Sequence, residues 1–383
     1  MPWGERILMD LRAEFVSAYL EGVNSMSALC REYGISRKTG YKWVERYRTG
    51  QSLCDQSRRP KHSPCKTPAE TEKLIIRTRQ EHPAWGAAKL LKVLQNQGIH
   101  DLPSTSTVGN ILRRNHLISP RVSAIHRPYK RFERAHPNEL WQMDFKGDFL
   151  MENHQRCYPL TVLDDCSRCS LGVHALPNQR WAEVRSVLVS LFETYGLPDT
   201  FLSDNGPPWG NGQSRGMTEF EVWMMQLDIF PIHGRALHPQ TQGKEERFHR
   251  TMKEELLSVT TIKDLADAQR QFDAFVTMYN TVRPHHALKL DVPCKHYTVS
   301  KRRLPNTLSD PMYDDKFVVC RVRMNGSTRY NGKEYYVGSP LADHTIAVEE
   351  LPDDCLRFCF YNFEIAKFDL IDNCFISRKI FRL

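Results

Sequence analysis

The sequence predicts a multidomain protein with an all-α N-terminal part, a central α/β part built on a mixed sheet, and a small C-terminal part that resembles a β-barrel. A chain of 383 residues is too long for one ordinary domain. Amphipathic helical patterns fill the first third, alternating strand and helix patterns begin near residue 138, and strands with Asn-Gly turns fill the end. These three observations predict the fold class.

Charge is distributed unevenly along the chain. Residues 1–136 contain 24 Lys and Arg against 12 Asp and Glu, whereas the other residues contain 29 against 33. We expect the basic part to bind a polyanion, with a merely solvated surface as the alternative. No apolar run approaches the roughly 20 residues of a membrane span. The eleven cysteines show no repeated spacing, and no secretory signal precedes them, so we expect an intracellular protein with free thiols and no membrane partner.

Residues 1–52 are expected to form a helix-turn-helix domain. Spacing typical of a core is shown by Leu29, Tyr33, Ile35, Trp43, Val44 and Tyr47. The turn YGIS precedes a basic helix, and the second helix of such a motif presents its N-terminal residues to base edges in the major groove. The expected DNA contacts at this helix are Ser36, Arg37, Lys38, Tyr41 and Lys42. An ordinary helical hairpin with a charged face is the alternative.

A second helical domain is expected between two basic linkers. Residues 53–67 are rich in Pro, Ser and charge, which predicts a linker that follows phosphates. Residues 68–118 contain three amphipathic helices and predict a second helix-turn-helix domain. Residues 119–137 have no apolar period and form the second basic linker. The expected DNA contacts in these segments are Arg58, Arg59, Lys61, Arg113 and Arg114.

Residues 138–300 are expected to form a mixed sheet covered by helices. The segments LWQMDFKGDF, RCYPLTVLDD and CSLGVHAL predict three consecutive strands, which a helix over residues 178–195 and the strand TFLSDNG follow. Residues 310–383 then alternate between apolar and polar, with turns at Asn325-Gly326 and Asn331-Gly332. This pattern predicts a small β-barrel or meander.

Two aspartates lie at unusual places in the predicted strands. In LWQMDFKGDF, Trp141 and Met143 share one face, so Asp144 lies on the other face of an apolar strand. A buried mid-strand Asp is rare without a partner. Asp204 ends the strand TFLSDNG, at the carboxyl edge where ligands of α/β folds commonly bind. A turn-capping role is the alternative for Asp204.

Two adjacent glutamates begin the helix in HPQTQGKEERFHR. A buried stripe at intervals of four is formed by Phe248, Met252 and Leu256. Glu245 lies along the edge of this stripe, and Glu246 points away from it. Glu246 shares its face with Arg250 and Lys253, as expected where a metal-bound acid meets a phosphate backbone, although a surface ion pair would explain the same spacing. The expected DNA contacts near this helix are Lys244, Arg250 and Lys253.

Two aspartates on strands and one glutamate on a neighbouring helix suit a centre of two Mg²⁺ ions. Mg²⁺ prefers a few carboxylate oxygens and leaves its remaining sites to water and phosphate. Two such ions would activate a water or hydroxyl nucleophile and stabilise a leaving 3′ oxygen, so no nucleophilic side chain is required. Mn²⁺ is expected to substitute.

The motifs WQMDFKG, TVLDDCSR, SDNGPPWG, HPQTQGKEERFHR and YNTVRPHHAL resemble the integrase-core transposases of bacterial insertion sequences, which are relatives of retroviral integrases in the DDE superfamily. The resemblance covers nearly the whole chain. It implies an RNase H-like catalytic domain, with the catalytic and metal-binding triad on Asp144, Asp204 and Glu246. It also implies hydrolysis at the 3′ ends of the terminal inverted repeats, followed by attack of the 3′-OH on target DNA. The implied partners are double-stranded DNA and further copies of the chain in a synaptic complex, in the bacterial cytoplasm at the nucleoid.

Some features depart from this pattern or leave alternatives open. Forty-one residues separate Asp204 from Glu246, more than in the simplest family pattern, and we expect a surface loop between them. Asp165 is expected to pair with Arg168, and a role as a metal ligand is its less favoured alternative. The thiols of the lone C-x-x-C, Cys166 and Cys169, are expected to be structural. A catalytically silent DNA-binding repressor or domesticated remnant is the main alternative function, and a structure-selective nuclease is a third.

Overall fold

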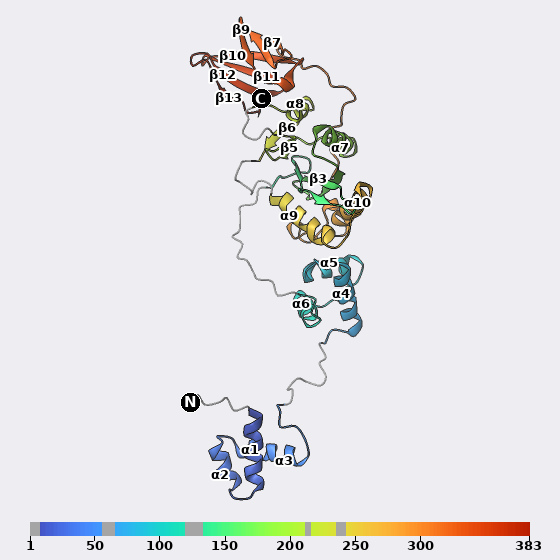
Figure 1. Cartoon of the computed structure of the whole chain (residues 1–383), viewed down its shortest axis with the longest axis vertical. Coiled ribbons are helices and arrows are strands. Elements are labelled where there is room, and N and C mark those ends of the chain that lie inside the picture. Colours follow the sequence, from blue (N-terminus) through green and yellow to red (C-terminus); the bar gives the residue numbers. More distant parts are fainter. Residues whose placement is uncertain (1–7, 56–65, 119–132, 211–215, 235–242) are drawn as a thin grey trace. The chain divides into compact units, whose positions relative to one another are not determined.

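The computed structural model describes residues 8–55, 66–118, 133–210, 216–234 and 243–383 (Figure 1). The chain divides into two compact units, Met1–Lys66 and Thr67–Leu383. The finer domain boundaries expected from the sequence remain predictions. Three of the expected DNA contacts lie outside the described residues, namely Arg58, Arg59 and Lys61.

The first unit contains three helices around a small apolar core. These are α1 (Leu8–Leu20), α2 (Met26–Glu32) and α3 (Arg37–Arg48). Its buried residues are Phe15, Val16, Met26, Leu29, Cys30, Trp43 and Val44. The helices approach so closely that a Cβ on Gly40 would lie 2.7 Å from the sulfur of Met26 and 2.8 Å from that of Cys30. The expectation that Tyr47 belongs to this core is wrong, because α1 and α2 cover only the face of α3 that carries Gly40, Trp43 and Val44, and Tyr47 is 55% exposed.

The second unit begins with three further helices, as the amphipathic patterns predict. These are α4 (Ala69–Glu81), α5 (Ala87–Asn96) and α6 (Thr105–Arg114). The hydroxyl of Ser104 accepts the backbone N–H of Thr107 and so caps the start of α6. The fully buried side chains of Ile75, Leu90 and Ile111 come from the three different helices and hold them together.

A mixed sheet forms the centre of the second unit, as expected. Its strands are β1 (Trp141–Phe145), β2 (Phe149–Leu150), β3 (Arg156–Asp164), β4 (Ser170–Leu176), β5 (Thr200–Ser203) and β6 (Phe230–His233). The order is β2-β3-β1-β5-β6, with β4 also paired to β3. β1 pairs antiparallel with β3 and parallel with β5, and β5 pairs parallel with β6.

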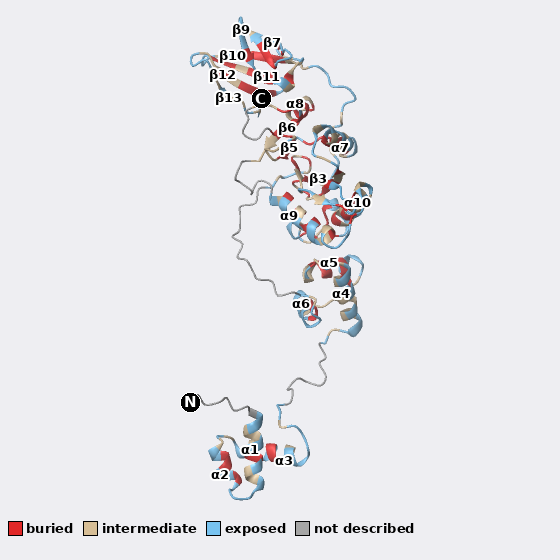
Figure 2. Ribbon diagram, viewed as in Figure 1, coloured by how far each residue is buried: buried red, intermediate tan, exposed pale blue. Residues whose placement is uncertain are grey.

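Helices cover both faces of this sheet, and the alternation along each strand assigns every side chain to a face. The covering helices are α7 (Trp181–Tyr195), α8 (Glu219–Gln226), α9 (Gly243–Met252) and α10 (Leu265–Thr281), and a π-helical turn, η2 (Lys253–Leu257), continues α9. On β3, Leu160 and Val162 pack with α7 and α8, whereas Leu163 packs with α9 and α10. Figure 2 shows buried residues along the strands and the inward sides of these helices. Three short 3₁₀ helices are η3 (His286–Leu288), η4 (Pro293–His296) and η5 (Ser339–Leu341).

The C-terminal part is antiparallel, as the alternating pattern predicts. Its strands are β7 (Val318–Arg321), β8 (Ser327–Tyr330), β9 (Lys333–Tyr336), β10 (Thr345–Leu351), β11 (Cys355–Phe360), β12 (Phe363–Asp369), β13 (Cys374–Ser377) and β14 (Phe381–Arg382). One sheet has the order β13-β12-β11-β10-β7 with β14 beside β12, and β8 pairs with β9. These pairings do not close into a ring, so the expected barrel is not confirmed.

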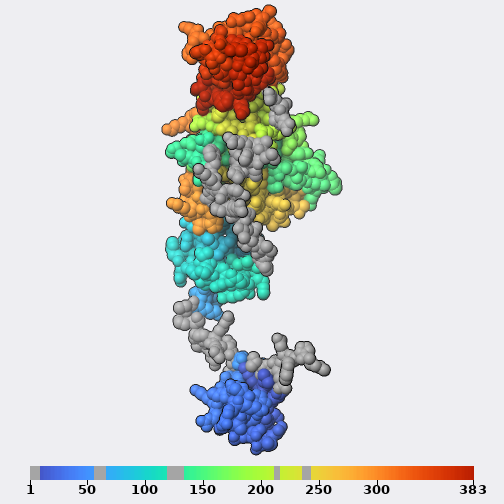
Figure 3. Space-filling model, turned by 90° about the vertical axis from the view of Figure 1, so that its left-hand side faces the viewer, coloured from blue at the N-terminus to red at the C-terminus, as the bar shows by residue number. Residues whose placement is uncertain are grey.

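The C-terminal sheet packs on the mixed-sheet part through α8. Val222 and Met225 of α8 belong to its apolar cluster, and the rings of Phe230 and Phe363 stack with centroids 6.2 Å apart. In the space-filling view this sheet, orange to red, adjoins the yellow-green residues of α8 and β6 (Figure 3).

Among the described residues, no helix is both long enough and apolar enough to cross a membrane.

Candidate active site

Asp144 lies on β1, on the face opposite to the two large apolar side chains of that strand. Trp141 and Met143 are fully buried against α7 and α8, so Asp144 projects toward the side that α9 covers. Its side chain is 24% exposed. The neighbouring strand supports its backbone, because the hydroxyl of Thr161 donates to the carbonyl oxygen of Asp144 at 3.0 Å.

Asp204 directly follows β5, which is the parallel neighbour of β1. The register pairs Trp141 with Phe201 and Gln142 with Leu202, and continued by two residues it puts Asp144 level with Asp204. Parallel strands lie about 4.8 Å apart. The two aspartates therefore meet at one edge of the sheet, as the sequence predicts.

The carboxylate of Asp204 is also held by its own loop. Its Oδ1 accepts the backbone N–H of Gly206 at 3.1 Å and the indole N–H of Trp209. The alternative that Asp204 caps a turn is thus observed, and it does not exclude a second role, because the other carboxylate oxygen stays available to a ligand. Trp209 is almost fully buried and keeps the loop against the sheet.

The electrostatics of Asp144 show that like charges surround it. Burial, followed by the charge of Asp204 and to a lesser extent that of Glu246, raises the pKa of Asp144 to about 7. An acid whose pKa is raised by other acids is typical of a site that binds a cation or shares a proton. The charges of the other two acids selected from the sequence, Asp204 and Glu246, therefore act on Asp144.

The two adjacent glutamates of α9 face opposite ways. Glu245 is fully buried, whereas Glu246 is exposed, together with Arg250 and Lys253. Burial, with the charge of Asp144 as the next cause, raises the pKa of Glu245 well above its ordinary value. Glu246 is therefore the one of the pair whose carboxylate is accessible to a ligand.

A polar cluster behind Asp144 was not found from the sequence. The hydroxyl of Thr161 lies 3.1 Å from Oε2 of Glu245 and 2.8 Å from Nε2 of His249, besides its contact with the Asp144 carbonyl. One hydroxyl hydrogen cannot serve three partners at once, so the Thr161 hydroxyl can accept a hydrogen from the imidazole while it donates its own to one of the two oxygens. Burial, aided by the charge of Lys146, lowers the pKa of His249 to about 4, which keeps the ring neutral. The available sequence signals were the spacing of four between Glu245 and His249 and the isolated polar Thr161 on an apolar strand.

The chemistry of the three acids fits a hard divalent cation, but they do not form a ready-made cage. Within the described ranges, no three His, Cys, Asp or Glu side chains lie close enough together to hold a metal ion. The donors themselves are the oxygen ligands that Mg²⁺ and Mn²⁺ prefer.

Asp165 and Lys244 have different partners from those expected. Arg168 does not pair with Asp165, because its Nη2 donates to Glu133 at 2.8 Å. Asp165 instead binds the ammonium of Lys244, whose side chain is only 19% exposed. Lys244, an expected DNA contact, is thus engaged within the protein. The thiol of Cys166 contacts the carbonyl oxygen of Ala135 at 3.4 Å, and both thiols of the C-x-x-C are free.

The expected contacts on α3 lie at its exposed start. Arg37, Lys38 and Tyr41 are exposed. The hydroxyl of Ser36 accepts a hydrogen bond from the backbone N–H of Thr39 and so caps the helix, which is a structural role. The ammonium of Lys42 lies 4.6 Å from the centre of the Trp43 ring.

The other expected contacts are divided between paired and exposed side chains. On α6, Arg113 donates to Asn110 at 2.7 Å, and Arg114 forms an ion pair with Glu72. On α9 and η2, Arg250 and Lys253 are exposed on the side of Glu246. Among the expected contacts outside α3, Arg250 and Lys253 are the best placed to bind a polyanion beside the acids.

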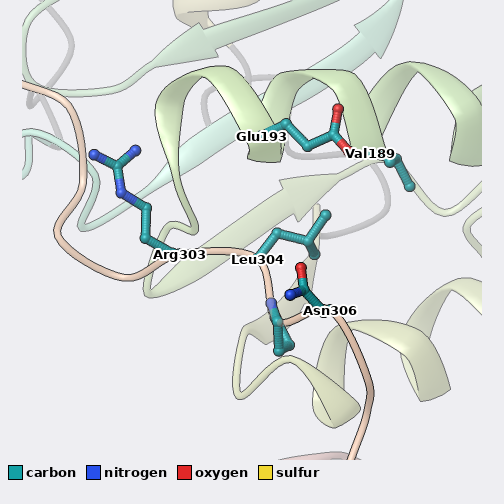
Figure 4. Close-up of a pocket in the computed structure, with 6 residues that line it drawn as sticks. Val189, Glu193, Arg303, Leu304 and Asn306 are labelled. Carbon is teal, nitrogen blue, oxygen red and sulfur yellow. The ribbon is translucent and has the colours of Figure 1, made fainter.

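A shallow pocket elsewhere in the molecule contains none of these residues. Val189 and Glu193 of α7 form one wall, and the segment with Arg303, Leu304 and Asn306 forms the other (Figure 4). Its lining combines one acid, one base and apolar carbons, without a convergent group of titratable side chains. It gives no indication of a catalytic role.

Comparison with known proteins matches most of the chain to described domains. An integrase core domain matches residues 134–239 and, in a second model, residues 227–293. A helix-turn-helix domain matches residues 11–61, and a homeodomain-like domain matches residues 39–112.

Relatives of this chain occur in bacterial insertion sequences. A putative transposase for insertion sequence element IS5376 of Geobacillus stearothermophilus is 23% identical over 94% of this chain and 88% of its own length. An uncharacterized 39.2 kDa protein of insertion element IS476 from Xanthomonas euvesicatoria is 27% identical over 59% of this chain and 64% of its own length. The Gag-Pol polyprotein of a baboon endogenous virus is 30% identical over 37% of this chain and 8% of its own length.

Solved structures similar to this chain include two retroviral ones. The integrase catalytic core domain of HTLV-2 in complex with magnesium covers 42% of this chain and 98% of its own, with 15% identity and a TM-score of 0.32. An intasome of simian T-cell lymphotropic virus covers 76% of this chain and 96% of its own, with 17% identity and a TM-score of 0.37. The chain therefore carries an integrase core domain behind helix-turn-helix domains, and it is similar to a transposase of a bacterial insertion sequence over most of its length.

Proposed function

We propose that this protein is a DNA transposase that binds the terminal inverted repeats of an insertion sequence, cleaves at their 3′ ends and transfers each 3′-OH to target DNA. It uses two divalent cations, Mg²⁺ or Mn²⁺, held by Asp144, Asp204 and Glu246. It acts in the bacterial cytoplasm at the nucleoid, as a multimer that brings two element ends together.

One observation carries this proposal: the parallel pairing of β1 with β5 puts Asp144 level with Asp204, and burial, followed by the charges of Asp204 and Glu246, raises the pKa of Asp144. These residues come from a strand, the end of the parallel neighbouring strand and a helix, and they are distant in sequence. Like-charged groups that are brought together in a folded protein destabilise it unless a cation balances them. Ions bound here would draw the three carboxylates toward one another.

Each part of the chain has a defined task in the proposed reaction. Arg250 and Lys253 extend from the exposed face of the Glu246 helix and would hold the phosphates beside the scissile bond. The ions would activate a water or the 3′-OH of the DNA as nucleophile and stabilise the leaving oxygen. Glu245 and His249 hold Thr161 by hydrogen bonds, and Thr161 in turn fixes the backbone of Asp144. Exposed residues at the start of α3 would read the element ends.

The test is cleavage of the DNA that flanks the gene on each side. A labelled duplex from these flanks is incubated with the protein and Mg²⁺, together with a supercoiled plasmid as target. We expect nicked ends and joined products, and we expect Asp204→Ala to lose both while it still retards the duplex in a gel. Cleavage without joining would instead identify a nuclease.

A catalytically silent repressor is the second candidate, because the helix-turn-helix domains would bind DNA without any chemistry at the acids. A repressor would retard the flanking duplex at the same protein concentration but leave it intact. Asp204→Ala would then change nothing in either assay.

A further inference from the structure

Asp165 lies in the turn that follows β3, and its buried carboxylate is fully engaged. The residue is 1% exposed. Its Oδ1 accepts from Nε2 of Gln142 at 2.5 Å and from the ammonium of Lys244, and its Oδ2 accepts the backbone N–H of Arg134 at 2.9 Å. A buried carboxylate is tolerated only when a cation and hydrogen bonds replace its hydration. These three donors meet that requirement.

The three donors come from three different parts of the structure. Gln142 is on β1, two residues before Asp144 and on the same face of the strand. Lys244 is in the first turn of α9, two residues before Glu246. One carboxylate therefore joins the strand that carries one acid of the proposed triad to the helix that carries another.

The third donor belongs to the segment that enters the mixed-sheet part from the second helical domain. Arg134 contacts Asp165 through its backbone, and the preceding Glu133 pairs with Arg168, whose side chain is 11% exposed. The backbone N–H of Asp165 in turn donates to the carbonyl oxygen of Leu140 at 2.9 Å. The turn after β3 is thus fixed at both ends to the chain that precedes β1.

We propose that Asp165 is a positioning residue that sets the distance between Asp144 and Glu246. Through Gln142 it holds β1, through Lys244 it holds the start of α9, and through Arg134 it ties both to the entering segment. This inference rests on the proposed function. Lys244 acts within the protein in this arrangement and is not a contact to DNA.

The test compares variants that change only this contact. Asp165→Asn keeps the shape and one of the two acceptor oxygens but removes the charge, and Lys244→Met removes the ammonium. Lys244→Arg is the conservative partner, which retains a cation. Lys263→Met, at an exposed lysine outside the cluster, is the matched control. Each full-length variant is assayed for retardation of the flanking duplex and for cleavage as Mg²⁺ is varied.

We expect both single variants to require more Mg²⁺ for half-maximal cleavage and to cleave on the order of ten- to a hundredfold more slowly, since small displacements of catalytic groups have effects of this size. Retardation of the duplex should be unchanged. The double variant should be no worse than either single one, because both changes remove the same interaction. Lys244→Arg should restore most of the activity, and Lys263→Met should match the wild type.

Three results would overturn the inference. Cleavage by Asp165→Asn at the wild-type rate and Mg²⁺ requirement would show that the contact positions nothing. Weaker retardation by Lys244→Met but not by Asp165→Asn would show that Lys244 contacts DNA. A lower melting temperature with a normal Mg²⁺ requirement would reduce Asp165 to a stability role.

Failure of the proposed function is a separate result, because then the wild type itself does not cleave. In that case, amide hydrogen exchange still tests the positioning role of Asp165. Asp165→Asn should speed exchange at the amides of residues 247–252 on α9 relative to Lys263→Met. Unchanged exchange there would refute the positioning role independently of any activity.

Discussion

Replacement of Asp144 by Asn should stabilise the metal-free protein, and increasingly so as the pH rises. Burial, followed by the charge of Asp204, raises the pKa of Asp144 from 3.8 to about 7. The folded state therefore keeps this proton over a pH range in which the unfolded chain has lost it, so stability falls as the pH rises from about 4 to about 7. Asparagine resembles the neutral acid at every pH. The free energy of unfolding of Asp144→Asn, relative to that of the wild type, therefore grows as the pH rises from about 4 to about 7.

The magnitude follows from the size of the pKa change. A rise of about three pKa units corresponds to about 4 kcal/mol between the two protonation states. Because the side chain is 24% exposed, water screens part of this energy. We therefore expect the advantage of Asp144→Asn in the free energy of unfolding to grow by about 2 kcal/mol between about pH 5 and about pH 8.

Urea unfolding followed by tryptophan fluorescence would measure this difference, since Trp141 and Trp209 are buried in the same part of the structure. Glu152→Gln, at an exposed acid, is the control and should show no such trend. Mg²⁺ at a tenfold excess over its dissociation constant should add about 1.4 kcal/mol to the wild type and much less to Asp144→Asn. A variant that is no more stable than the wild type at about pH 8 would refute the view that like charges surround Asp144.

Three further predictions concern the helix faces. Glu246→Gln should abolish cleavage and spare DNA binding, while Glu245→Gln should retain substantial activity because Glu245 lies on the buried face of α9 and glutamine keeps its shape; equal losses in the cleavage assay would contradict this. Gly40→Ala should lower the free energy of unfolding of the first unit by about 1 to 3 kcal/mol in a thermal melt, because its Cβ would overlap two sulfur atoms, and unchanged stability would show that the helices can separate. Arg37→Ala and Lys42→Ala should each weaken end binding by about 1 to 3 kcal/mol in a gel titration if the side chain reads a base, and unchanged affinity of both would remove α3 from the DNA interface.

Local periodicity predicted the main helices and strands and the face of some of their residues. The alternation around Trp141 and Met143 put Asp144 on the opposite side of its strand, and the structure has it there. The Asn331-Gly332 turn predicted a hairpin, and both residues have the positive φ that joins β8 to β9. Such features depend on a few neighbouring residues, so they can be read from the sequence.

Contacts between distant residues could not be predicted in this way. Glu245 was placed at the edge of the buried stripe, but it is fully buried because Thr161, 84 residues earlier, offers it a polar partner. Lys244 looked like a solvated basic residue, and only the fold brings it to Asp165. Closure of the C-terminal strands into a barrel likewise depends on pairing between β7 and the last strands, which no local turn signal determines.

Helix α9 connects these conclusions, because four of its residues, within a span of seven, have different roles. Lys244 ties its start to Asp165, Glu245 faces inward to Thr161, Glu246 faces outward, and Arg250 continues the outward face. A helix turns by about 100° per residue, so any rotation that moves Glu246 also moves Lys244 and Glu245. The buried contacts of those two residues therefore determine where Glu246 can lie. On this view a substitution at either buried partner, Asp165 or Thr161, acts on the Mg²⁺ requirement of the reaction although neither residue touches the ion.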